Sequence, residues 1–272
     1  MRIYPLQTGT VTVKETQRHG RGAGLRRRAA MFTDDQWSEP LPIHCWLIDH
    51  EDGPILVDTG ETSEARDQRF ARFAVARADE IDFELGRIGL SPSDLKYVVL
   101  THGHGDHIDG VPRLRGALVL AGEHELRVLA SPGARLTRRL LGTPLPDGFD
   151  PQPLRLAAQP FGAFSHSAPL TADGTVVAVP TPGHSPGHLS VIVVIDDLHY
   201  FLAGDASFDQ EQLLALQVDG VAPNDAQARE TMRTILRHAD EHPTVFLPSH
   251  DVRSMDRLAG ATVLAGTLAV PG

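Results

Sequence analysis

The segment Thr101-His102-Gly103-His104-Gly105-Asp106-His107 directly follows the apolar run Tyr97-Val98-Val99-Leu100 and places three histidines and one aspartate within six positions. Neutral imidazoles and a carboxylate form a ligand set that suits Zn²⁺, with Fe or Mn as alternatives. In an extended segment His102, His104 and Asp106 project to one side, so His107 has to turn toward a second centre. The segment is therefore predicted to bind metal and to supply ligands to two ions.

A histidine-rich surface loop is the simplest alternative, because the chain contains 14 histidines. Three further candidate ligands oppose this interpretation, since each follows an apolar run typical of a strand. Val176-Val177-Ala178-Val179 precedes His184, Tyr200-Phe201-Leu202-Ala203 precedes Asp205, and Thr244-Val245-Phe246-Leu247 precedes His250. Four strand ends are therefore predicted to deliver seven ligands to one edge of the fold.

The complete pattern resembles that of the metallo-β-lactamase superfamily of metallohydrolases. The residues that carry the resemblance are His102-x-His104-x-Asp106-His107, His184, Asp205 and His250, with Asp58-Thr59-Gly60 upstream. The resemblance covers the chain from about Ile43 to His250. It implies an α/β fold, the αββα metallo-β-lactamase sandwich, in which helices flank two mixed β-sheets.

Two stretches look like the N-acyl homoserine lactone lactonases within that superfamily. They are Leu41-Pro42-Ile43-His44-Cys45-Trp46-Leu47-Ile48 and Gly53-Pro54-Ile55-Leu56-Val57-Asp58-Thr59-Gly60. A third, Thr181-Pro182-Gly183-His184-Ser185-Pro186-Gly187-His188, is also similar to them, but many hydrolases of the superfamily share it. The resemblance therefore implies a lactonase of the quorum-quenching type that opens N-acyl homoserine lactones.

The resemblance also assigns the ligands to two divalent ions, with Zn²⁺ expected and Fe, Mn or Co as alternatives. One ion is expected at His102, His104 and His184, the other at Asp106, His107 and His250, and Asp205 is expected to bridge them. Two cations about 3.5 to 4 Å apart can share a hydroxide and lower its pKa toward neutrality. That hydroxide would attack the lactone carbonyl, the metals would stabilise the developing charge, and Asp106 would move the proton.

Two further polar residues are expected to support the site. Asp58 falls at a strand end, where relatives have an aspartate that supports a metal-binding histidine. His188 lies four residues after His184, and a structural hydrogen bond is its preferred interpretation. The histidines without a supporting pattern are expected to be ordinary: His44, His124, His166, His199, His238 and His242.

One residue departs from the lactonase pattern. The residue three positions beyond the bridging aspartate is typically a tyrosine whose hydroxyl contacts the substrate, but here it is Phe208. A phenyl ring cannot donate that hydrogen bond, and the loss of one oxyanion donor can cost about 2.7 to 4 kcal/mol in the transition state. Either another donor substitutes or the substrate differs. Hydrolysis of a carboxylic ester or a phosphotriester is therefore the alternative function.

Strand-like and helical patterns alternate along the chain. Strands are predicted at Ile43–Ile48, Pro54–Val57, Tyr97–Leu100, Ala117–Leu120, Val176–Val179, Leu189–Ile195, Tyr200–Leu202 and Val245–Leu247. Helices are predicted over Ser63–Ala78 and Asp225–His238, where apolar residues recur at helical spacing. The alternation predicts two sheets in a layered core with helices outside.

The whole chain, residues 1–272, is predicted to form a single hydrolase domain. Two of its segments fit the layered core poorly and are predicted to be loops that shape the pocket. Residues 17–40 are rich in glycine and charge, which favours a mobile surface loop. Residues 131–173 contain seven prolines and are predicted to form an irregular cap with a short helix. Beside Phe208, the candidates to receive an acyl chain are Met31, Phe32, Trp37, Phe149, Phe161 and Phe164.

Composition narrows the classes of function. A chain of 272 residues with 41% apolar residues can bury the core of one enzyme domain. Its net charge of -10 argues against nucleic acid or membranes as partners, so a small-molecule substrate is expected, and a homodimer is left open. No apolar run suits a secretory signal or a membrane span, which predicts a cytoplasmic protein. The single cysteine, Cys45, is expected to be a buried thiol in a core strand.

Other functions of the superfamily fit the sequence less well. A flavodiiron site has a glutamate where His104 stands, glyoxalase II needs a helical domain for which the segment after His250 is short, and β-lactamases with a cysteine ligand would need one near Asp205. A persulfide dioxygenase with one iron stays open, but it would leave some of the ligands unused. A metal-stabilised binding protein without turnover is the remote alternative, because a degraded site would usually have lost some ligands.

Overall fold

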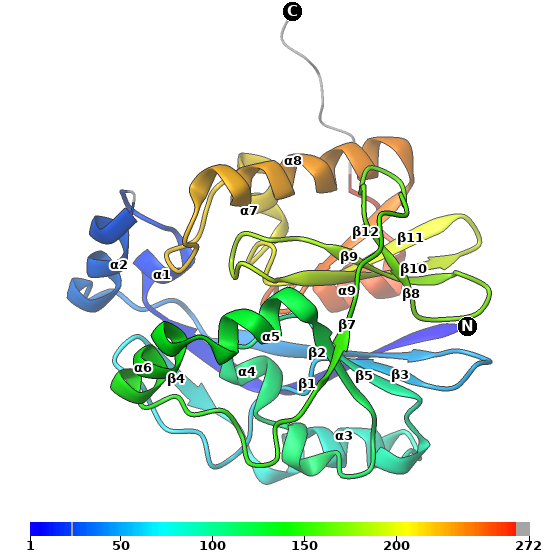
Figure 1. Cartoon of the computed structure of the whole chain (residues 1–272), viewed down its shortest axis with the longest axis horizontal. Helices are drawn as coiled ribbons and strands as arrows, with labels where there is room; N and C mark the ends of the chain where they lie inside the picture. The colour runs from blue at the N-terminus through cyan, green and yellow to red at the C-terminus, as the bar shows by residue number, and fades with distance from the viewer. Residues whose placement is uncertain (23, 265–272) are drawn as a thin grey trace, which may run out of the picture.

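Two β-sheets face each other across an apolar core, and helices cover their outer sides (Figure 1). The computed structural model describes residues 1–22 and 24–264. The first sheet contains, in spatial order, β4 (Ala71–Ala74), β1 (Arg2–Val13), β2 (Leu41–Asp49), β3 (Ile55–Val57), β5 (Tyr97–Leu100), β6 (Val119–Gly122) and β7 (Gln152–Leu154). The second contains β12 (Thr244–Pro248), β11 (Leu198–Gly204), β10 (Leu189–Ile195), β9 (Val176–Pro180) and β8 (Ala168–Pro169).

Each sheet combines parallel with antiparallel pairs. In the first, β1 and β2 are antiparallel while β3 and β5 are parallel. In the second, β9 and β10 are antiparallel while β11 and β12 are parallel. The predicted α/β sandwich of two mixed sheets with flanking helices is therefore confirmed.

The helices lie between the strands in sequence. They are α1 (Glu15–Arg18), α2 (Gly24–Thr33), α3 (Ile81–Arg87), α4 (Gly105–Ile108), α5 (Glu123–Ala130), α6 (Pro132–Leu141), α7 (Gln210–Ala215), α8 (Asp225–Glu241) and α9 (Ser254–Gly260). Short 3₁₀ helices are η1 (Arg77–Asp79), η2 (Pro92–Asp94) and η3 (Val111–Arg113). Among the helices of residues 1–22 and 24–264, none combines the length and the apolar character that crossing a membrane requires.

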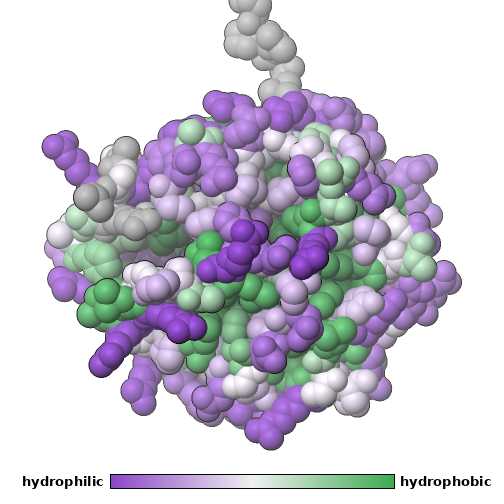
Figure 2. Space-filling view, viewed as in Figure 1, coloured by the Kyte–Doolittle hydropathy of each residue, from purple (hydrophilic) through white to green (hydrophobic). Residues whose placement is uncertain are grey.

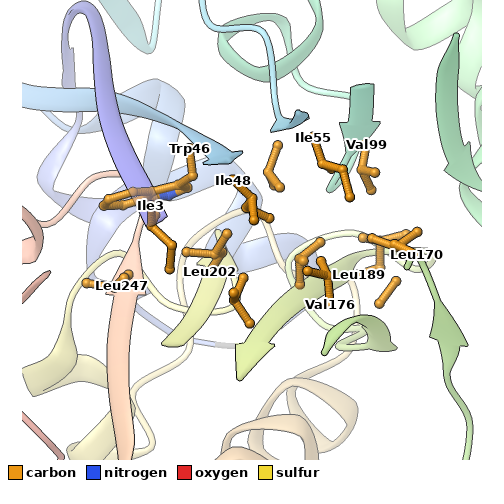
Figure 3. Packing of buried hydrophobic residues seen from close by; sticks show 14 of the residues in the cluster. Ile3, Trp46, Ile48, Ile55, Val99, Leu170, Val176, Leu189, Leu202 and Leu247 are labelled. Atoms are coloured by element: carbon orange, nitrogen blue, oxygen red, sulfur yellow. The ribbon is translucent and has the colours of Figure 1, made fainter. Parts of the chain in front are cut away.

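The pleat of the strands divides the core into an inner layer and two outer layers. Trp46 on β2 and Val99 on β5 point into the inner layer, where they pack with residues of the second sheet such as Leu202 (Figure 3). Cys45 and Val98, one position away in the same strands, point to the outer layer beneath α3. Cys45 is fully buried there, as predicted. On the other side, α8 covers the outer face of the second sheet.

Each of the eight predicted strands is present, within two residues of its predicted ends. The helix predicted from Asp225 is α8, which continues to Glu241. Four strands escape prediction. β1 contains Pro5 and a register shift between Gln7 and Thr10, which interrupt its alternation, while β4, β7 and β8 are two to four residues long.

The prediction of a helix over Ser63–Ala78 is wrong, because this segment contains β4 and the start of η1. β4 pairs antiparallel with β1, with Phe73 opposite Val11, and so covers part of the edge of β1. Phe70 and Phe73 also pack against the apolar cluster around Val11. The spacing of these two residues suits a helix. Pairing with the open edge of β1 and packing against this cluster favour a strand instead.

The two predicted loops contain more regular structure than expected. Residues 17–40 include α2, and its buried Arg27 forms an ion pair with Asp225 of α8, so this part of the segment is helical and not an irregular loop. Residues 131–173 contain the predicted short helix, α6, together with β7 and β8. α6 turns Leu136 and Leu140 to solvent, with 59% and 77% exposure, and apolar side chains reach the surface over α6 at the left of Figure 2.

Candidate metal centre

The carboxyl ends of four strands meet at one edge of the sandwich. β9 and β11 run in the same direction because both pair antiparallel with β10, and β12 is parallel to β11. β5 of the first sheet reaches the same edge, where the carbonyl of Thr101 accepts a hydrogen bond of 3.0 Å from the Leu189 N–H. The structure thereby brings all seven predicted ligands together, in two groups.

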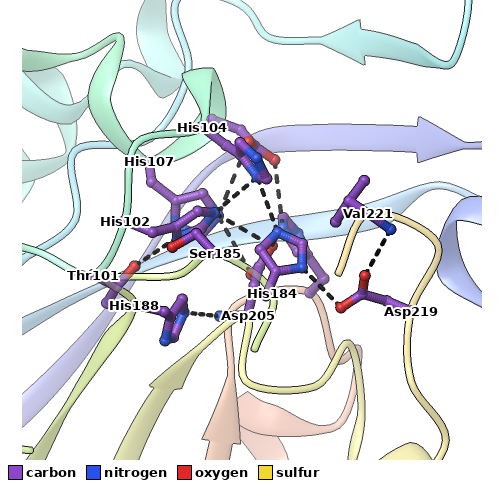
Figure 4. Close-up of polar contacts among 12 residues, drawn as sticks. Thr101, His102, His104, His107, His184, Ser185, His188, Asp205, Asp219 and Val221 are labelled. Atoms are coloured by element: carbon purple, nitrogen blue, oxygen red, sulfur yellow. Dashed lines mark hydrogen bonds and ion pairs between the residues drawn. The ribbon is translucent and has the colours of Figure 1, made fainter. Parts of the chain in front are cut away.

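His102, His104, His184 and Asp205 form the first group (Figure 4). His104 Nδ1 lies 3.0 Å from His102 Nε2 and 2.9 Å from His184 Nε2. Asp205 Oδ2 lies 3.3 Å from His184 Nε2 and 3.9 Å from His102 Nε2. The ligand atoms lie within 4.8 Å of one another, so one ion can contact all four residues.

Asp106, His107 and His250 form the second group. His250 Nε2 lies 3.4 Å from Asp106 Oδ2, and His107 Nε2 lies 3.9 Å from Asp106 Oδ1. Asp205 Oδ1 is 3.3 Å from the Nε2 atoms of both histidines, so Asp205 presents one oxygen to each group. Burial would raise the pKa of the Asp205 carboxyl, but the facing imidazoles of His250 and His107 hold it well below its ordinary value.

The donor atoms of both groups are arranged for a cation. His184 Nδ1 donates to a carboxylate at 2.9 Å and His250 Nδ1 donates to a backbone carbonyl at 2.8 Å. In each neutral ring the proton is therefore on Nδ1, and the Nε2 lone pair faces the centre. Within the described residues, His107 Nε2 and Asp205 Oδ1 are buried without a hydrogen-bond partner. Converging acceptors of this kind fit a divalent metal, which supplies the missing positive charge.

Asp58, at the end of β3, contacts His107 as its predicted support role requires. Its Oδ2 lies 2.8 Å from His107 Nδ1, and the carboxylate also accepts from the N–H and the hydroxyl of Thr101 at 2.8 and 2.9 Å. The Asp58 backbone adopts φ +62°, in the left-handed region that few residues other than glycine occupy. The backbone conformation and the three hydrogen bonds fix the carboxylate beneath the imidazole.

His188 makes hydrogen bonds, in agreement with its sequence interpretation. Its Nε2 accepts the backbone N–H of Asp205 at 3.0 Å, and its Nδ1 lies 2.8 Å from the hydroxyl of Thr181. Both ring nitrogens are therefore engaged by β9 and by the end of β11. His188 holds the loop of Asp205 against the loop of His184.

Asp219 supports His184 and was not predicted. Its Oδ2 accepts from His184 Nδ1 at 2.9 Å, and its Oδ1 accepts from the backbone N–H groups of Val221 and Ala222 at 2.8 Å. The loop around Asp219 lies directly against α1. The Gly220 N–H donates to the Gln17 carbonyl at 2.7 Å, and a Cβ on Gly220 would come within 2.3 Å of the Thr16 carbonyl oxygen.

Two further acids face Gly105, between His104 and Asp106, and were also not predicted. A Cβ on Gly105 would lie 3.0 Å from Asp109 Oδ2 and 3.5 Å from Glu61 Oε2. Burial and the nearby Asp109 raise the pKa of Glu61 to about 8. Burial and the nearby Asp106 raise the pKa of Asp109 to about 7. These acids therefore carry protons more readily than ordinary carboxyls near neutral pH.

The ring of Phe208 lies at the candidate centre. It stacks on His250 with 5.5 Å between ring centroids and stands edge-on to His184 at 6.0 Å. The side chain is buried and belongs to the apolar cluster of Val11 and Ile43. The structure thus places Phe208 beside ligands of both groups.

The three apolar candidates from residues 17–40 have different surroundings. Met31 is buried, and its sulfur would be 3.0 Å from a Cβ on Gly220, beside the loop that supports His184. Phe32 meets Phe70 edge-on at 5.9 Å. Trp37 is held by cation–π contacts, with Lys14 Nζ 3.8 Å and the Arg72 guanidinium carbon 4.0 Å from its ring.

The three phenylalanines from residues 131–173 pack on the outer faces of the sandwich, which explains their apolar character without a pocket. Phe149 packs against the layer beneath α3. Phe161 and Phe164 pack on the α8 side, where Phe161 stacks on His199 and His238, and Phe164 lies 5.9 Å from Phe201. The structure does not bring these rings to the ligand groups.

Comparison with known proteins shows what the chain is similar to. Residues 38–250 match the family model of the metallo-beta-lactamase superfamily. The chain is 25% identical to the N-acyl homoserine lactonase AttM of Agrobacterium fabrum, over 92% of this chain and 93% of that protein. It is 30% identical to a probable metallo-hydrolase of Mycobacterium tuberculosis, over 64% of this chain and 59% of that protein.

The fold is similar to that of a solved N-acyl homoserine lactone hydrolase, whose structure has the product N-hexanoyl-L-homoserine bound at its catalytic metal center. The TM-score is 0.73 at 19% sequence identity, over 94% of this chain and 95% of that chain. At this identity the likeness shows a shared architecture. The two sheets and their flanking helices therefore have a counterpart among solved structures.

Proposed function

Since the chain belongs to the metallo-beta-lactamase superfamily, we propose that it is a two-metal lactonase that opens N-acyl homoserine lactones. As a member of this superfamily with lactonase relatives, the chain is a metal-dependent hydrolase that acts on ester bonds. The observation that carries the two-metal proposal is the position of Asp205. Its Oδ1 is 3.3 Å from His107 and His250, and its Oδ2 is 3.3 Å from His184.

One ion would be held by His102, His104 and His184, and the other by Asp106, His107 and His250, with Asp205 shared between them. Zn²⁺ suits this set of imidazole and carboxylate ligands. When bound, two divalent ions would supply a Lewis acid for the carbonyl oxygen and an activated water as the nucleophile.

Asp106 is the residue of this chain best placed to move the proton. Its carboxylate is only partly buried, and its Oδ2 and Oδ1 lie 3.4 Å from His250 Nε2 and 3.9 Å from His107 Nε2, beside the centre where the activated water would react. A carboxylate in this position accepts a proton as the water attacks and returns it to the alkoxide that leaves when the ring opens. Asp58 and Asp219 keep the Nδ1 protons of His107 and His184 away from the centre.

The relationship to a lactonase over nearly the full length of both chains supports the substrate class. Phe208 favours a second candidate, because its ring offers no hydrogen-bond donor beside His184 and His250. A carboxylic ester or a phosphotriester whose apolar group packs on that ring is therefore the alternative substrate.

A panel of lactones, aryl esters and phosphotriesters, assayed together with elemental analysis, tests the proposal. The enzyme is expected to carry two divalent ions per chain and to release one proton per lactone opened near neutral pH, which a pH indicator records. Hydrolysis of aryl esters or phosphotriesters without any lactone would replace the substrate class by the alternative. A single ion per chain in fully active enzyme would contradict the two-metal site.

The variant Phe208→Tyr separates the two substrate classes. For a lactone, the restored phenol is expected to hold or raise kcat/KM, by up to about 10²- to 10³-fold, because a donor to the developing oxyanion is worth about 2.7 to 4 kcal/mol. For a substrate with an apolar group against the ring, the buried hydroxyl would be unpaired and kcat/KM would fall. Steady-state kinetics on one lactone and one aryl ester, at equal metal content, distinguish the two substrate classes. A loss confined to the lactone would count against the lactonase proposal.

A further inference from the structure

We propose that Glu125 is a positioning residue for one of the two ions: it fixes the three histidines of the first group and leaves the second group unaffected. The proposal rests on the two-metal site proposed above. Glu125 lies in the first turn of α5, more than 15 residues beyond the His102–His107 segment, and it is buried with 3% exposure. Within residues 1–22 and 24–264, its carboxylate makes no hydrogen bond to a ligand side chain.

The carboxylate of Glu125 joins two ligand-bearing loops through three hydrogen bonds. Its Oε1 accepts the backbone N–H of Gly103 at 3.0 Å. Its Oε2 accepts the hydroxyl of Ser185 at 2.9 Å and the backbone N–H of Gly187 at 3.0 Å. Gly103 lies between His102 and His104, and Ser185 follows His184. One side chain therefore sets the distance between all three histidines of the first group.

Close packing of α5 against both loops makes this connection rigid. A Cβ on Gly187 would lie 2.2 Å from the Glu125 backbone nitrogen and 2.5 Å from its Cα. A Cβ on Gly103 would lie 2.6 Å from the nearer Leu129 side-chain carbon, one turn further along α5. Only glycine fits at position 187, where the loop lies directly on the backbone of α5, and a larger residue at position 103 would have to displace the Leu129 side chain. A small displacement of Glu125 would therefore displace the histidines as well.

The second group has separate support. His107 is held by Asp58 at 2.8 Å, and His250 is held by the Pro42 carbonyl at 2.8 Å. Pro42 lies in β2 and Asp58 directly follows β3, whereas Glu125 lies in α5. Asp58 also reaches the first group, because it accepts from the Thr101 hydroxyl, which lies 3.1 Å from His102 Nδ1. Glu125 therefore supports the first group, and Asp58 supports the second group directly and His102 indirectly.

Replacement of Glu125 by glutamine exchanges one of its two hydrogen-bond acceptors for a donor. An ionised carboxylate is an acceptor on both oxygens, and all three partners of Glu125 are donors. In Glu125→Gln the amide NH₂ would face either the Gly103 N–H or the Ser185 and Gly187 donors, and at least one buried N–H would lose its acceptor. The loop of His102 and His104 would then no longer be fixed relative to the loop of His184.

The experiment measures the release of each ion from the holoenzyme. Wild type, Glu125→Gln and Asp58→Asn are loaded with two equivalents of Zn²⁺, and transfer of zinc to a chromophoric chelator is followed in time. Glu125→Gln is expected to speed one phase of release by about 10- to 100-fold, the usual effect of losing an outer support of a metal ligand. Asp58→Asn is expected to speed the other phase most, because Asp58 contacts His107 directly and His102 only through the Thr101 hydroxyl. Glu123→Gln, on the solvent side of α5, is the matched control and should match wild type.

The same variants show which outcomes would overturn the role proposed for Glu125. Equal acceleration of both phases by Glu125→Gln, or of neither in a folded variant, would overturn the assignment. If Glu125→Gln does not fold, Ser185→Ala removes one of the three hydrogen bonds and should speed the same single phase by a smaller factor. A wild type that holds one ion would contradict the two-metal function; unchanged release of that ion in Glu125→Gln would overturn the role of Glu125 as well.

Discussion

In the variant Asp205→Asn, kcat/KM for the preferred substrate is expected to fall by about a thousandfold or more, a loss of about 4 kcal/mol of transition-state stabilisation. Asp205 offers one oxygen to each ligand group, and a neutral amide cannot balance two dications. Its NH₂ would also point at a Nε2 lone pair that the metal needs. The metal content is expected to drop below two ions per chain.

Folding should survive this substitution, which separates the metal effect from a structural one. Within residues 1–22 and 24–264, Asp205 Oδ1 and His107 Nε2 are buried without a hydrogen-bond partner, 3.3 Å from each other. An asparagine NH₂ can donate to such a nitrogen and so offsets part of the lost attraction between the Asp205 carboxylate and the facing histidines. The free energy of unfolding of the metal-free chain should therefore fall by no more than about 3 kcal/mol. Urea unfolding of both metal-free proteins measures this. A variant that keeps two ions and loses less than tenfold in kcat/KM would contradict the bridging role.

Asp106→Asn is expected to lower kcat by roughly 10²- to 10³-fold, within the range that a positioned proton acceptor contributes. The amide cannot take the proton from the attacking water, and it is a weaker ligand than the carboxylate it replaces. Kinetics at saturating substrate and saturating Zn²⁺ measure the loss with the second site filled. If excess Zn²⁺ restored the wild-type kcat, Asp106 would act as a ligand only.

Asp109→Asn is the matched control for this prediction. Asp109 follows Asp106 by three residues, and burial together with Asp106 raises its pKa to about 7. Because burial and Asp106 favour the neutral form of this carboxyl, an amide resembles that form. Its substitution should change kcat by no more than a few-fold. A loss as large as that of Asp106→Asn would indicate that the proton passes through both carboxyls.

The ligands could be predicted from sequence because each is tied to a local pattern. His184, Asp205 and His250 each follow an apolar run that forms a strand, and the strand ends meet at one edge because the strands run in the same direction. Asp58 had a similar signal at the end of β3. Strand position and residue type together were enough to locate these side chains.

Residues that act through tertiary contacts had no such signal. Asp219 is a single aspartate 35 residues beyond the histidine that it supports, and Glu125 is one of two acids in α5. The roles predicted for the aromatic rings depended on tertiary contacts in the same way. A phenylalanine in an irregular segment can line a pocket or fill a core, and packing against α8 decided the matter for Phe161 and Phe164. The mispredicted helix over 63–78 was decided by the open edge of β1.

The contact between Gly220 and the carbonyls of Thr16 and Gln17 bears on how such an enzyme can be redesigned. Exchanging residues 15–33 for the corresponding segment of a relative would be an obvious route to a new substrate range. Here the donor segment would have to reproduce a backbone surface that accepts the Gly220 N–H and leaves no space for a side chain. A graft that fails to do so would displace Asp219. Its first effect would be to weaken the support of His184 and not to change the preference among substrates.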